Sequence, residues 1–587
     1  MTNEKYKNIL NYTPSIYQEA IFDFVEHGIG NGAIRAYAGS GKTATMIAAM
    51  KLVDPLKKIL FLAFNKAIET EIKFKVANYP NCEVKTLHSL GYSIINSNLR
   101  VKPQISSSKY SNYLKNELGG YIPQGLYGNS YKKYINNINN LLKFSRLNLC
   151  QSLNEIENIA DIYGLMLIEN EHEMVLKLME YGKNDLSIID YTDMVWLPNE
   201  LDMDSKFYKY DWIFNDEVQD YSIAFVNLMK RCIKRGGRYI VCGDENQAIN
   251  QFAGASSTAF LDLYNGPKTT QFELPISYRC DKSIIKLAQR FVPGIMTREE
   301  VGEGLIRRET LIKDIKPNDM VLCRLNSPLY MCYSRLMDLN IPCYIKGKEG
   351  ELDELKKLID TYKEGENLGL DWKENGLFPN LYKALIEERN SYIENGYDNI
   401  EAINSQSVQY LYDNIQSLIA IGRKCQTVSE LKHRLENIFI EIENGVCLST
   451  IHKAKGLEAD TVHIICPSLM PMKNTVTPIE EQQEQNLIYV AYTRAKHTLN
   501  FVSEGDFNPV KSLNNDIVDT FDYIEDRVCK LFKISYKKPK NTIIQPKKKR
   551  GKKINPIIRS TTTNVKTAVD RKNKKSTKNK IMDFLNQ

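Results

Sequence analysis

The chain has 587 residues, of which 43% are hydrophobic and 25% are charged, the composition of a soluble globular protein with several domains. No run of the sequence approaches the ~20 apolar residues of a membrane span, and from the polar start we expect no signal peptide. The twelve cysteines include no C-x-x-C pair. We therefore expect no zinc or iron–sulfur centre, and reduced thiols in a cytosol-like compartment.

The charge is divided unevenly along the chain. Residues 537–587 hold 17 of the 78 Lys and Arg residues, opposed there only by Asp570 and Asp583. Residues 1–536 are left with 61 basic and 69 acidic groups, a net charge of −8, although the whole chain carries +7. An anionic polymer bound by this acidic part would have to lie in a local groove, because the overall field would not attract it.

The first candidate binding residue in chain order is Gln18, which precedes an amphipathic segment at 19–27. A glutamine amide can donate to and accept from an adenine edge. Considered alone, however, Gln18 is expected at the protein surface.

Residues 33–50 form the strongest local pattern, a strand followed by a glycine-rich turn and a helix. Such a turn points backbone N–H groups at a phosphate, and the helix dipole favours the anion. Lys42 would reach the β- and γ-phosphates, and Thr43 would offer its hydroxyl to Mg²⁺. Ala36 stands where glycine usually opens the pattern, and a turn without a ligand is the alternative. The cradle itself would be Ala38, Gly39, Ser40 and Gly41.

Polar residues follow the next two predicted strands. Residues 58–64 read as a buried strand that ends before Asn65, and a strand at 83–85 precedes His88. Ligands gather at the carboxyl ends of strands in open α/β sheets, so these residues suit contacts to a nucleic-acid backbone. Ordinary polar loops are the alternative for each.

A pair of carboxylates could supply the Mg²⁺ ligand and the water-polarising base that the phosphate loop lacks. Residues 92–189 are polar, helical and free of catalytic patterns, so we interpret them as an insertion. The sheet resumes with a strand at 210–215, followed by Asp216 and Glu217. Asp216 can hold Mg²⁺ and Glu217 can polarise an attacking water. The alternative is that both acids are ordinary, solvated residues of a turn.

The second half repeats this parallel α/β architecture without a phosphate loop. A strand at 238–244, followed by Gln247, completes the first sheet. Further strands are expected in the second half, with a second polar helical insertion at 348–444. The expected strands are 320–324, 341–345, 446–451 and 498–502.

Taken together, these blocks resemble the UvrD/Rep-like helicases of superfamily 1A, and within them the F-box DNA helicase branch. The resemblance spans residues 12–535 apart from the insertions, and the acidic segment 190–194 belongs to it. The segments occur in the family's order: Gln at 18, AGSGKT at 38–43, AFNKAI at 63–68, TLHS at 86–89, DEVQD at 216–220, GDENQ at 243–247, SYR at 277–279, HKAKGLE at 452–458 and YVAYTRAK at 489–496.

The resemblance implies an α/β fold of two RecA-like parallel-sheet P-loop NTPase domains with ATP between them. Domain 1A would comprise 1–91 and 190–275, around the helical insertion 1B at 92–189. Domain 2A would comprise 276–347 and 445–535, around the helical insertion 2B at 348–444. A disordered basic tail would take 536–587.

It also implies roles for individual side chains. Gln247 would sense the γ-phosphate, with Lys42 and Glu217 as its catalytic neighbours, and Arg279 and Arg494 would act as arginine fingers. Gln18 would read adenine, Tyr278 would stack on it, and Glu458 would bind the ribose. Ala253 stands where the family often has an arginine. Single-stranded DNA would cross Phe64, Asn65, His88, Phe252 and His452.

The implied activity is ATP- and Mg²⁺-dependent 3′→5′ DNA unwinding in replication, repair or recombination, since 454–456 resembles the 3′→5′ class. One alternative is a motor that clears recombinase from single strands with little unwinding. Another is an ATP-gated single-strand-binding protein, which the intact Glu217, Arg279 and Arg494 disfavour. The basic tail argues against a fused nuclease.

The tail from residue 537 lacks hydrophobic periodicity, so we expect a disordered arm that holds phosphates nonspecifically. Its cluster at 546–550 resembles a nuclear-import signal, which matters only in a eukaryotic host. Otherwise a cytoplasmic protein at a nucleoid or viral replication site is expected. Near the end, Ile581, Phe584 and Leu585 have a spacing similar to peptides that bind sliding clamps, with a chance match as the alternative.

Overall fold

Two parallel β-sheets organise the protein. The computed structural model describes residues 6, 13–119, 122, 128–163, 165, 167, 170–250, 254, 258–347, 350–394, 396–472, 478–503 and 517–536. Within these ranges, no helix combines the length and apolarity that a bilayer span requires. All twelve cysteines lie in them, and each is a free thiol.

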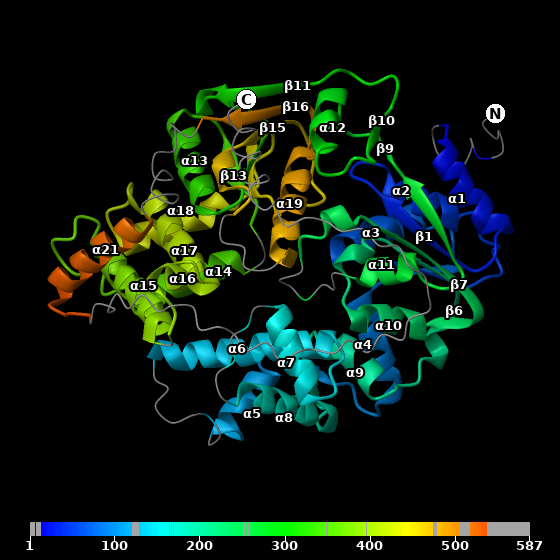
Figure 1. Cartoon of the computed structure of the whole chain (residues 1–587), viewed down its shortest axis with the longest axis horizontal. Helices are drawn as coiled ribbons and strands as arrows, with labels where there is room; N and C mark the ends of the chain where they lie inside the picture. Colours follow the sequence, from blue (N-terminus) through cyan, green and yellow to red (C-terminus); the bar gives the residue numbers. More distant parts are fainter. Residues whose placement is uncertain are drawn as a thin grey trace, which may run out of the picture. The chain divides into compact units, whose positions relative to one another are not determined.

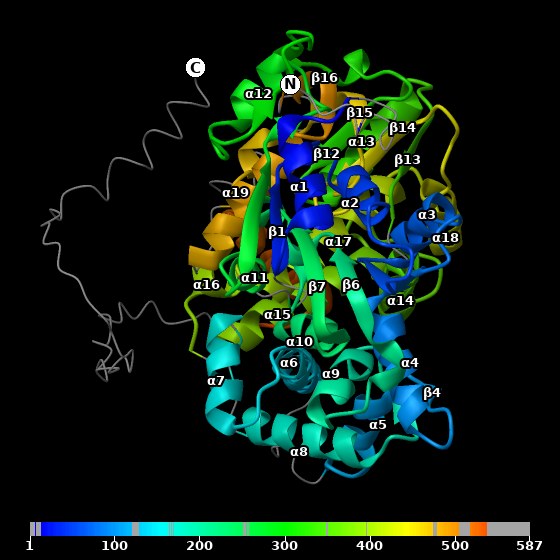
Figure 2. The ribbon, with the colours of Figure 1, turned by 90° about the vertical axis from the view of Figure 1, so that its right-hand side faces the viewer.

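The first sheet has six parallel strands in the order β3-β2-β6-β7-β1-β8. Figure 2 shows β6, β7 and β1 of this sheet. The strands β1, β2, β3 and β6 lie where the sequence predicts them, whereas β7 begins earlier and β8 was not predicted. Their bounds are β1 (Asn31–Ala36), β2 (Ile59–Ala63), β3 (Cys82–Thr86), β6 (Tyr210–Asn215), β7 (Ile233–Gly243) and β8 (Thr269–Leu274).

Alternating side chains bury both faces of this sheet, as a parallel sheet requires. Ile59 and Phe61 of β2 pack in one hydrophobic cluster, and Leu60 and Leu62 pack in another. The first cluster includes α1 (Ile16–His27), α2 (Lys42–Met50) and α3 (Lys66–Lys75). The second includes α4 (Leu87–Asn98), α9 (Asp193–Glu200), α10 (Ile223–Arg231) and α11 (Ala259–Tyr264).

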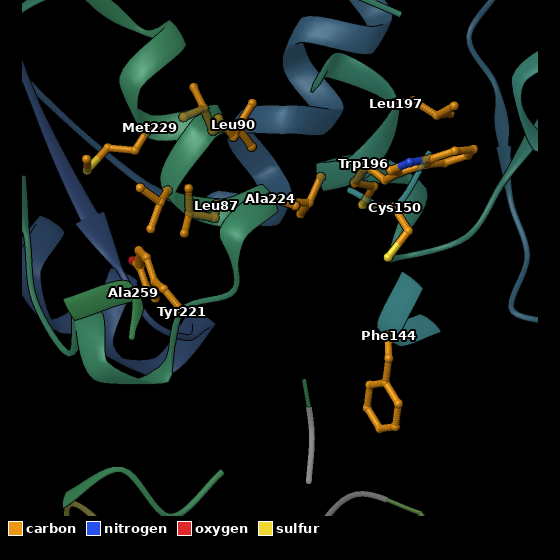
Figure 3. Packing of buried hydrophobic residues seen from close by; sticks show 14 of the residues in the cluster. Leu87, Leu90, Phe144, Cys150, Trp196, Leu197, Tyr221, Ala224, Met229 and Ala259 are labelled. Atoms are coloured by element: carbon orange, nitrogen blue, oxygen red, sulfur yellow. The ribbon is translucent and has the colours of Figure 1, made fainter. Parts of the chain in front are cut away.

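The helices of the first insertion share the second cluster rather than forming a separate core. Figure 3 shows Leu87 and Leu90 of α4 beside Ala224 and Met229 of α10. Gly91 brings α4 against α9, since a Cβ there would lie 1.8 Å from the Met194 carbonyl oxygen. The inserted elements are β4 (Gln104–Ile105), α5 (Lys109–Asn116), α6 (Gly128–Leu147), α7 (Leu153–Ile162), α8 (Glu171–Asn184) and β5 (Ile188–Ile189).

The second sheet also has six parallel strands, in the order β11-β16-β15-β12-β14-β13. The parallel α/β class predicted from the sequence is therefore confirmed. Two strands were not predicted, because the edge strand β11 is mostly polar and exposed and β15 starts with polar residues. The bounds are β11 (Leu305–Thr310), β12 (Met320–Cys323), β13 (Cys343–Ile345), β14 (Val446–Thr450), β15 (Ala459–Ile464) and β16 (Ala495–Val502).

Helices cover both faces of the second sheet as well. On one face, α12 (Lys282–Ala288) contacts β11 and β16, and α19 (Pro478–Tyr492) contacts β16. On the other lies α13 (Ser327–Asp338) with the second insertion. In Figure 1, α21 (Ile517–Phe532) lies against this insertion, where it contacts α15 and α16. The inserted helices are α14 (Glu351–Tyr362), α15 (Leu377–Glu394), α16 (Asn399–Ile403), α17 (Gln406–Gly422) and α18 (Val428–Ile438).

Candidate functional site

The turn between β1 and α2 has the geometry of a phosphate-binding loop. Gly39 and Gly41 adopt left-handed φ values of +72° and +75°, which glycine reaches without steric cost. A Cβ at Gly39 would lie only 2.6 Å from Cβ of Arg279. Ser40 Oγ is buried and, among the residues that the structure describes, has no hydrogen-bond partner. These features fit a loop that wraps an anionic ligand.

Two acids that follow β6 meet this loop. Lys42 Nζ lies 3.0 Å from Oε1 of Glu217, and Thr43 Oγ1 donates a 2.6 Å hydrogen bond to Oδ2 of Asp216. Mg²⁺ prefers oxygen ligands, so Thr43 and Asp216 fit a magnesium site. Glu217 has a left-handed φ of +58°, a strained conformation of the kind that clusters at functional sites.

The surroundings of the two acids shift their pKa values in opposite directions. Burial, reinforced by the charge of Glu217, raises the pKa of Asp216 to about 6. Burial also acts to raise the pKa of Glu217, but the cations of Lys42 and Lys455 outweigh it and lower that pKa to about 2. Glu217 is therefore ionised at neutral pH, as a residue that accepts a proton from water must be.

The predicted sensor Gln247 lies on the 3-10 turn η5 (Glu245–Gln247), just after β7. Its Nε2 donates a 2.6 Å hydrogen bond to Oδ2 of Asp244. Burial raises the pKa of Asp244, although the charge of Lys42 opposes this. Both side chains are buried, so this hydrogen bond orients the Gln247 side chain relative to its own turn.

Arg279, just after the short strand β9 (Ile276–Ser277), lies against the phosphate loop and is already paired. Its Nε donates a 2.6 Å hydrogen bond to Oε2 of Glu458, and its Nη1 donates to the Thr493 carbonyl. Lys496 Nζ lies 3.4 Å from the other carboxylate oxygen of Glu458. The structure thus brings the predicted arginine finger and the predicted ribose ligand together.

Arg494 is buried among backbone carbonyls. Its Nε and Nη1 donate to the carbonyls of Val490 and Leu457 at 3.0 and 3.1 Å, and no carboxylate in the described ranges forms an ion pair with it. Burial and the neighbouring charge of Arg279 lower the pKa of Arg494 to about 9. A buried guanidinium in such surroundings suits an anionic ligand such as a phosphate.

Gln18 is not at the surface, so the expectation drawn from that residue alone is wrong. It is the third residue of α1, completes a capping box with Ser15, and is fully buried. Its Nε2 donates a 2.8 Å hydrogen bond to Thr45 Oγ1 of α2. Its Oε1 lies 3.4 Å from the hydroxyl of Tyr278, which can donate to it. The two residues predicted to meet adenine therefore lie together, although an adenine would compete with these hydrogen bonds.

Tyr489 of α19 is a site residue for which the sequence analysis predicted no role. Its hydroxyl oxygen accepts a 3.0 Å hydrogen bond from Ala38 N of the phosphate loop, and the side chain is fully buried. Tyr489 and Arg494 lie in the same predicted segment, 489–496. Only Arg494 of that segment was predicted to reach the nucleotide, since no local pattern marks the contact of Tyr489 with a residue 451 positions away.

The residues predicted to meet a nucleic-acid strand differ in availability. Phe64 is 40% exposed and free to stack, whereas Asn65 Oδ1 caps α3 by accepting from Ile68 N. His88 packs edge-on against Phe225, and burial lowers its pKa, so it is neutral. His452 is half-buried in the turn after β14, and Phe252 lies outside the described residues.

Tyr191 was missed as a candidate for strand binding. It is 62% exposed and lies edge-on to His88, with ring centroids 6.4 Å apart. Its neighbours Asp190 and Asp193 are held by Arg146, at 2.9 and 2.8 Å. The segment 190–194 shows in sequence only an aromatic residue near two acids, and the exposure of the ring and the anchoring of the acids appear only in the structure.

Two sequence families match the chain. The UvrD/REP helicase N-terminal domain matches residues 18–268, and the UvrD-like helicase C-terminal domain matches 445–502. Among similar proteins, F-box DNA helicase protein 1 of Schizosaccharomyces pombe is 26% identical over 79% of this chain and 55% of its own length.

Two further relatives differ in how far the match extends. F-box DNA helicase 1 of Gallus gallus is 25% identical over 81% of this chain and 48% of its own length. A probable DNA helicase II homolog of Mycoplasma genitalium is 22% identical over 80% of this chain and 82% of its own. The chain thus spans about half the length of the two F-box relatives.

Proposed function

The chain belongs to the UvrD/REP helicase family, and we propose that it is an ATP-dependent helicase that moves 3′→5′ along single-stranded DNA. One observation carries the proposal. The phosphate loop and Glu217 follow strands of the first sheet, Arg279 reaches the loop from the end of β9, and Arg494 approaches Glu217 from just before β16 of the second sheet. A site built from two sheets can couple the closing of the domains to the hydrolysis of ATP.

The side chains divide the chemistry among themselves. Lys42 would leave Glu217 and hold the terminal phosphates, while Glu217, freed from that ion pair, would accept the proton of the attacking water. Arg494 would meet the charge that develops on the transferred phosphoryl group, for which its surroundings of neutral carbonyls prepare it. Mg²⁺, held by Thr43 and Asp216, would supply positive charge beside the phosphate oxygens.

Strand binding is proposed for three aromatic or imidazole side chains, namely Phe64 after β2, His88 after β3 and Tyr191 after β5. Phe64 and Tyr191 would stack on bases, which tolerates any sequence, and neutral His88 would hydrogen-bond rather than form an ion pair. Lys455, in the segment that resembles the 3′→5′ class, forms an ion pair of 2.5 Å with Asp220, on the 3-10 turn η4 (Val218–Asp220) after β6. This contact offers a link between strand-binding and hydrolytic residues.

Strand displacement on duplexes with either a 3′ or a 5′ single-stranded tail tests the proposal. We expect ATP-dependent unwinding of the 3′-tailed duplex only, abolished in Lys42→Ala. Unwinding of the 5′-tailed duplex alone would overturn the polarity. DNA-stimulated ATPase activity without displacement on either substrate would favour the strand-clearing motor instead.

A further inference from the structure

The turn that carries Gln247 is held by side chains from the second half of the chain. Asn486, in α19, donates from Nδ2 to two carbonyl oxygens of this turn, Glu245 O and Ala248 O, both at 3.0 Å. These two carbonyls bracket the sensor residue in sequence. The amide of Asn486 therefore contacts the backbone on both sides of Gln247.

Two more side chains from the second half of the chain complete this grip. Lys455 Nζ donates a 2.9 Å hydrogen bond to the carbonyl of Gln247 itself. Gln483 Nε2 donates a 2.9 Å hydrogen bond to the carbonyl of Ile249. Buried carbonyls need such partners, so these side chains satisfy the backbone of the sensor turn.

Burial and hydrogen bonds fix the orientation of the Asn486 side chain. It is 4% exposed, and its Oδ1 accepts a 3.0 Å hydrogen bond from Gln482 Nε2, one turn earlier in α19. Two carbonyl acceptors on one side and an amide donor on the other fix which end of the carboxamide carries the hydrogens. A residue of α19 itself, Gln482, thus helps to orient Asn486 towards the turn.

The same helix face carries another contact with the first sheet's loops. Tyr489, three residues after Asn486, holds Ala38 N of the phosphate loop, and residues three apart share a face of an α-helix. Arg494 follows shortly after the helix ends at Tyr492. One rigid element therefore connects the sensor turn, the phosphate loop and the buried arginine.

We propose that Asn486 is a positioning residue that sets Gln247 for the γ-phosphate only while α19 is seated on the η5 turn. The proposal rests on the proposed function, because it assumes that Gln247 meets that phosphate. When α19 moves away, Glu245 O and Ala248 O lose their donors and the turn loses its geometry. Domain closure would then reach the sensor through the backbone as well as through the arginines.

A double-mutant cycle with Gln247 tests the assignment. We expect Asn486→Ala to lower DNA-stimulated kcat about tenfold, the rate equivalent of one lost hydrogen bond, with a smaller change in KM. In a Gln247→Ala background the same change should have little further effect, because the residue through which it acts is gone. Losses that simply add in the cycle would overturn the proposal.

Nucleotide binding provides a readout that does not depend on turnover. Asn486→Ala should weaken binding of a non-hydrolysable ATP analogue and leave ADP binding unchanged, since ADP lacks the phosphate that Gln247 would meet. An equal loss for both nucleotides would indicate a merely structural role and overturn the proposal. If the wild-type protein had no ATPase activity, the proposed function would fail, and these titrations would still decide the role of Asn486.

Two variants of the same helix serve as controls. Gln483→Ala removes a hydrogen bond of the same kind, but from Ile249, beyond the turn, so its effect on analogue binding should be clearly smaller. Gln482→Ala leaves Asn486 in place and frees only its Oδ1, so it should shift binding in the same direction as Asn486→Ala, but less. An effect of Gln483→Ala equal to that of Asn486→Ala would show that any hydrogen bond between α19 and this segment matters equally, and it would contradict the assignment.

Discussion

The ammonium group of Lys42 lies 3.0 Å from Oε1 of Glu217, so the phosphate-binding cation and the candidate general base neutralise each other. Glu217→Gln should therefore do two things at once. Turnover should fall by about 10²–10⁴, the usual weight of general-base catalysis, while ATP binding is kept or strengthened because Lys42 is released. Steady-state ATPase assays and nucleotide titrations measure the two effects. Wild-type DNA-stimulated hydrolysis in Glu217→Gln would remove the role from this residue.

Arg494 and Arg279 should be needed for hydrolysis and hardly for DNA affinity. Arg494→Ala should abolish most turnover because no other described cation takes its buried position between Val490 O and Leu457 O. Glu458→Gln weakens the hold on Arg279, and its effect on KM for ATP should be milder than that of either arginine variant. The contrast is Phe64→Ala, which should weaken single-strand binding by about 1–3 kcal/mol and spare basal ATPase. Normal hydrolysis in Arg494→Ala would contradict the arginine-finger model.

If His88 is neutral, the affinity for single-stranded DNA should not depend on its protonation near neutral pH. Burial lowers its pKa below the usual value of about 6.5, so single-strand affinity should show no His88-dependent rise between pH 8 and about 6.5. His88→Gln should keep most of the affinity, and His88→Ala should lose it. Because the folded-state pKa is the lower one, His88 penalises folding progressively as the pH falls below about 6.5. Fluorescence anisotropy across pH, with wild type and His88→Gln compared, would expose a charged His88 as a pH-dependent difference.

A buried cluster of ion pairs joins the first insertion to the segment after it, and we expect this cluster to contribute strongly to the free energy of unfolding. Arg146 is 3% exposed and lies 2.9 Å from Asp190 and 2.8 Å from Asp193, which Lys109 also contacts at 3.0 Å. Arg146→Met leaves buried carboxylates short of a partner and should cost about 3–5 kcal/mol of stability. Urea unfolding measures it.

The control for this prediction is an exposed ion pair. Lys530 and Asp526 form an i, i+4 pair on α21 and are 73% and 55% exposed. Lys530→Met should change the free energy of unfolding by less than about 1 kcal/mol. Equal effects of Lys530→Met and Arg146→Met would contradict the view that burial makes the Arg146 cluster important.

The sequence predicted elements whose signal is local and missed those whose signal is tertiary. The phosphate loop, β6 and the acids after it depend on a few adjacent residues, so their pattern was sufficient. By contrast, β11 joins the sheet by pairing with β16, and β15 lies between β16 and β12. The polar residues of both strands hide these pairings. The polar edge of β11 carries no hydrophobic alternation to recognise.

The site shows the same division between local and tertiary signals. Lys42, Thr43, Asp216 and Glu217 meet as the strand order implies, because their strands end at one edge of a parallel sheet. The burial of Gln18 follows from Thr45 on a neighbouring helix, which single-residue statistics cannot include. The contact of Tyr489 with Ala38 joins residues 451 positions apart, and no local pattern encodes such a pairing.

The last prediction concerns residues 537–587, which lie outside the described residues. Their 17 Lys and Arg residues can neutralise DNA phosphates, so deletion of 537–587 should flatten the log–log salt dependence of single-strand binding by about 0.7 for each phosphate that the arm neutralises. Core ATPase activity should remain, since no candidate hydrolytic residue lies in this segment. We also expect Ile581→Ala with Phe584→Ala to abolish capture of a sliding clamp without changing DNA affinity. Binding measured from low to high salt decides the first point, and equal slopes for the full and truncated chains would show that the arm does not hold DNA.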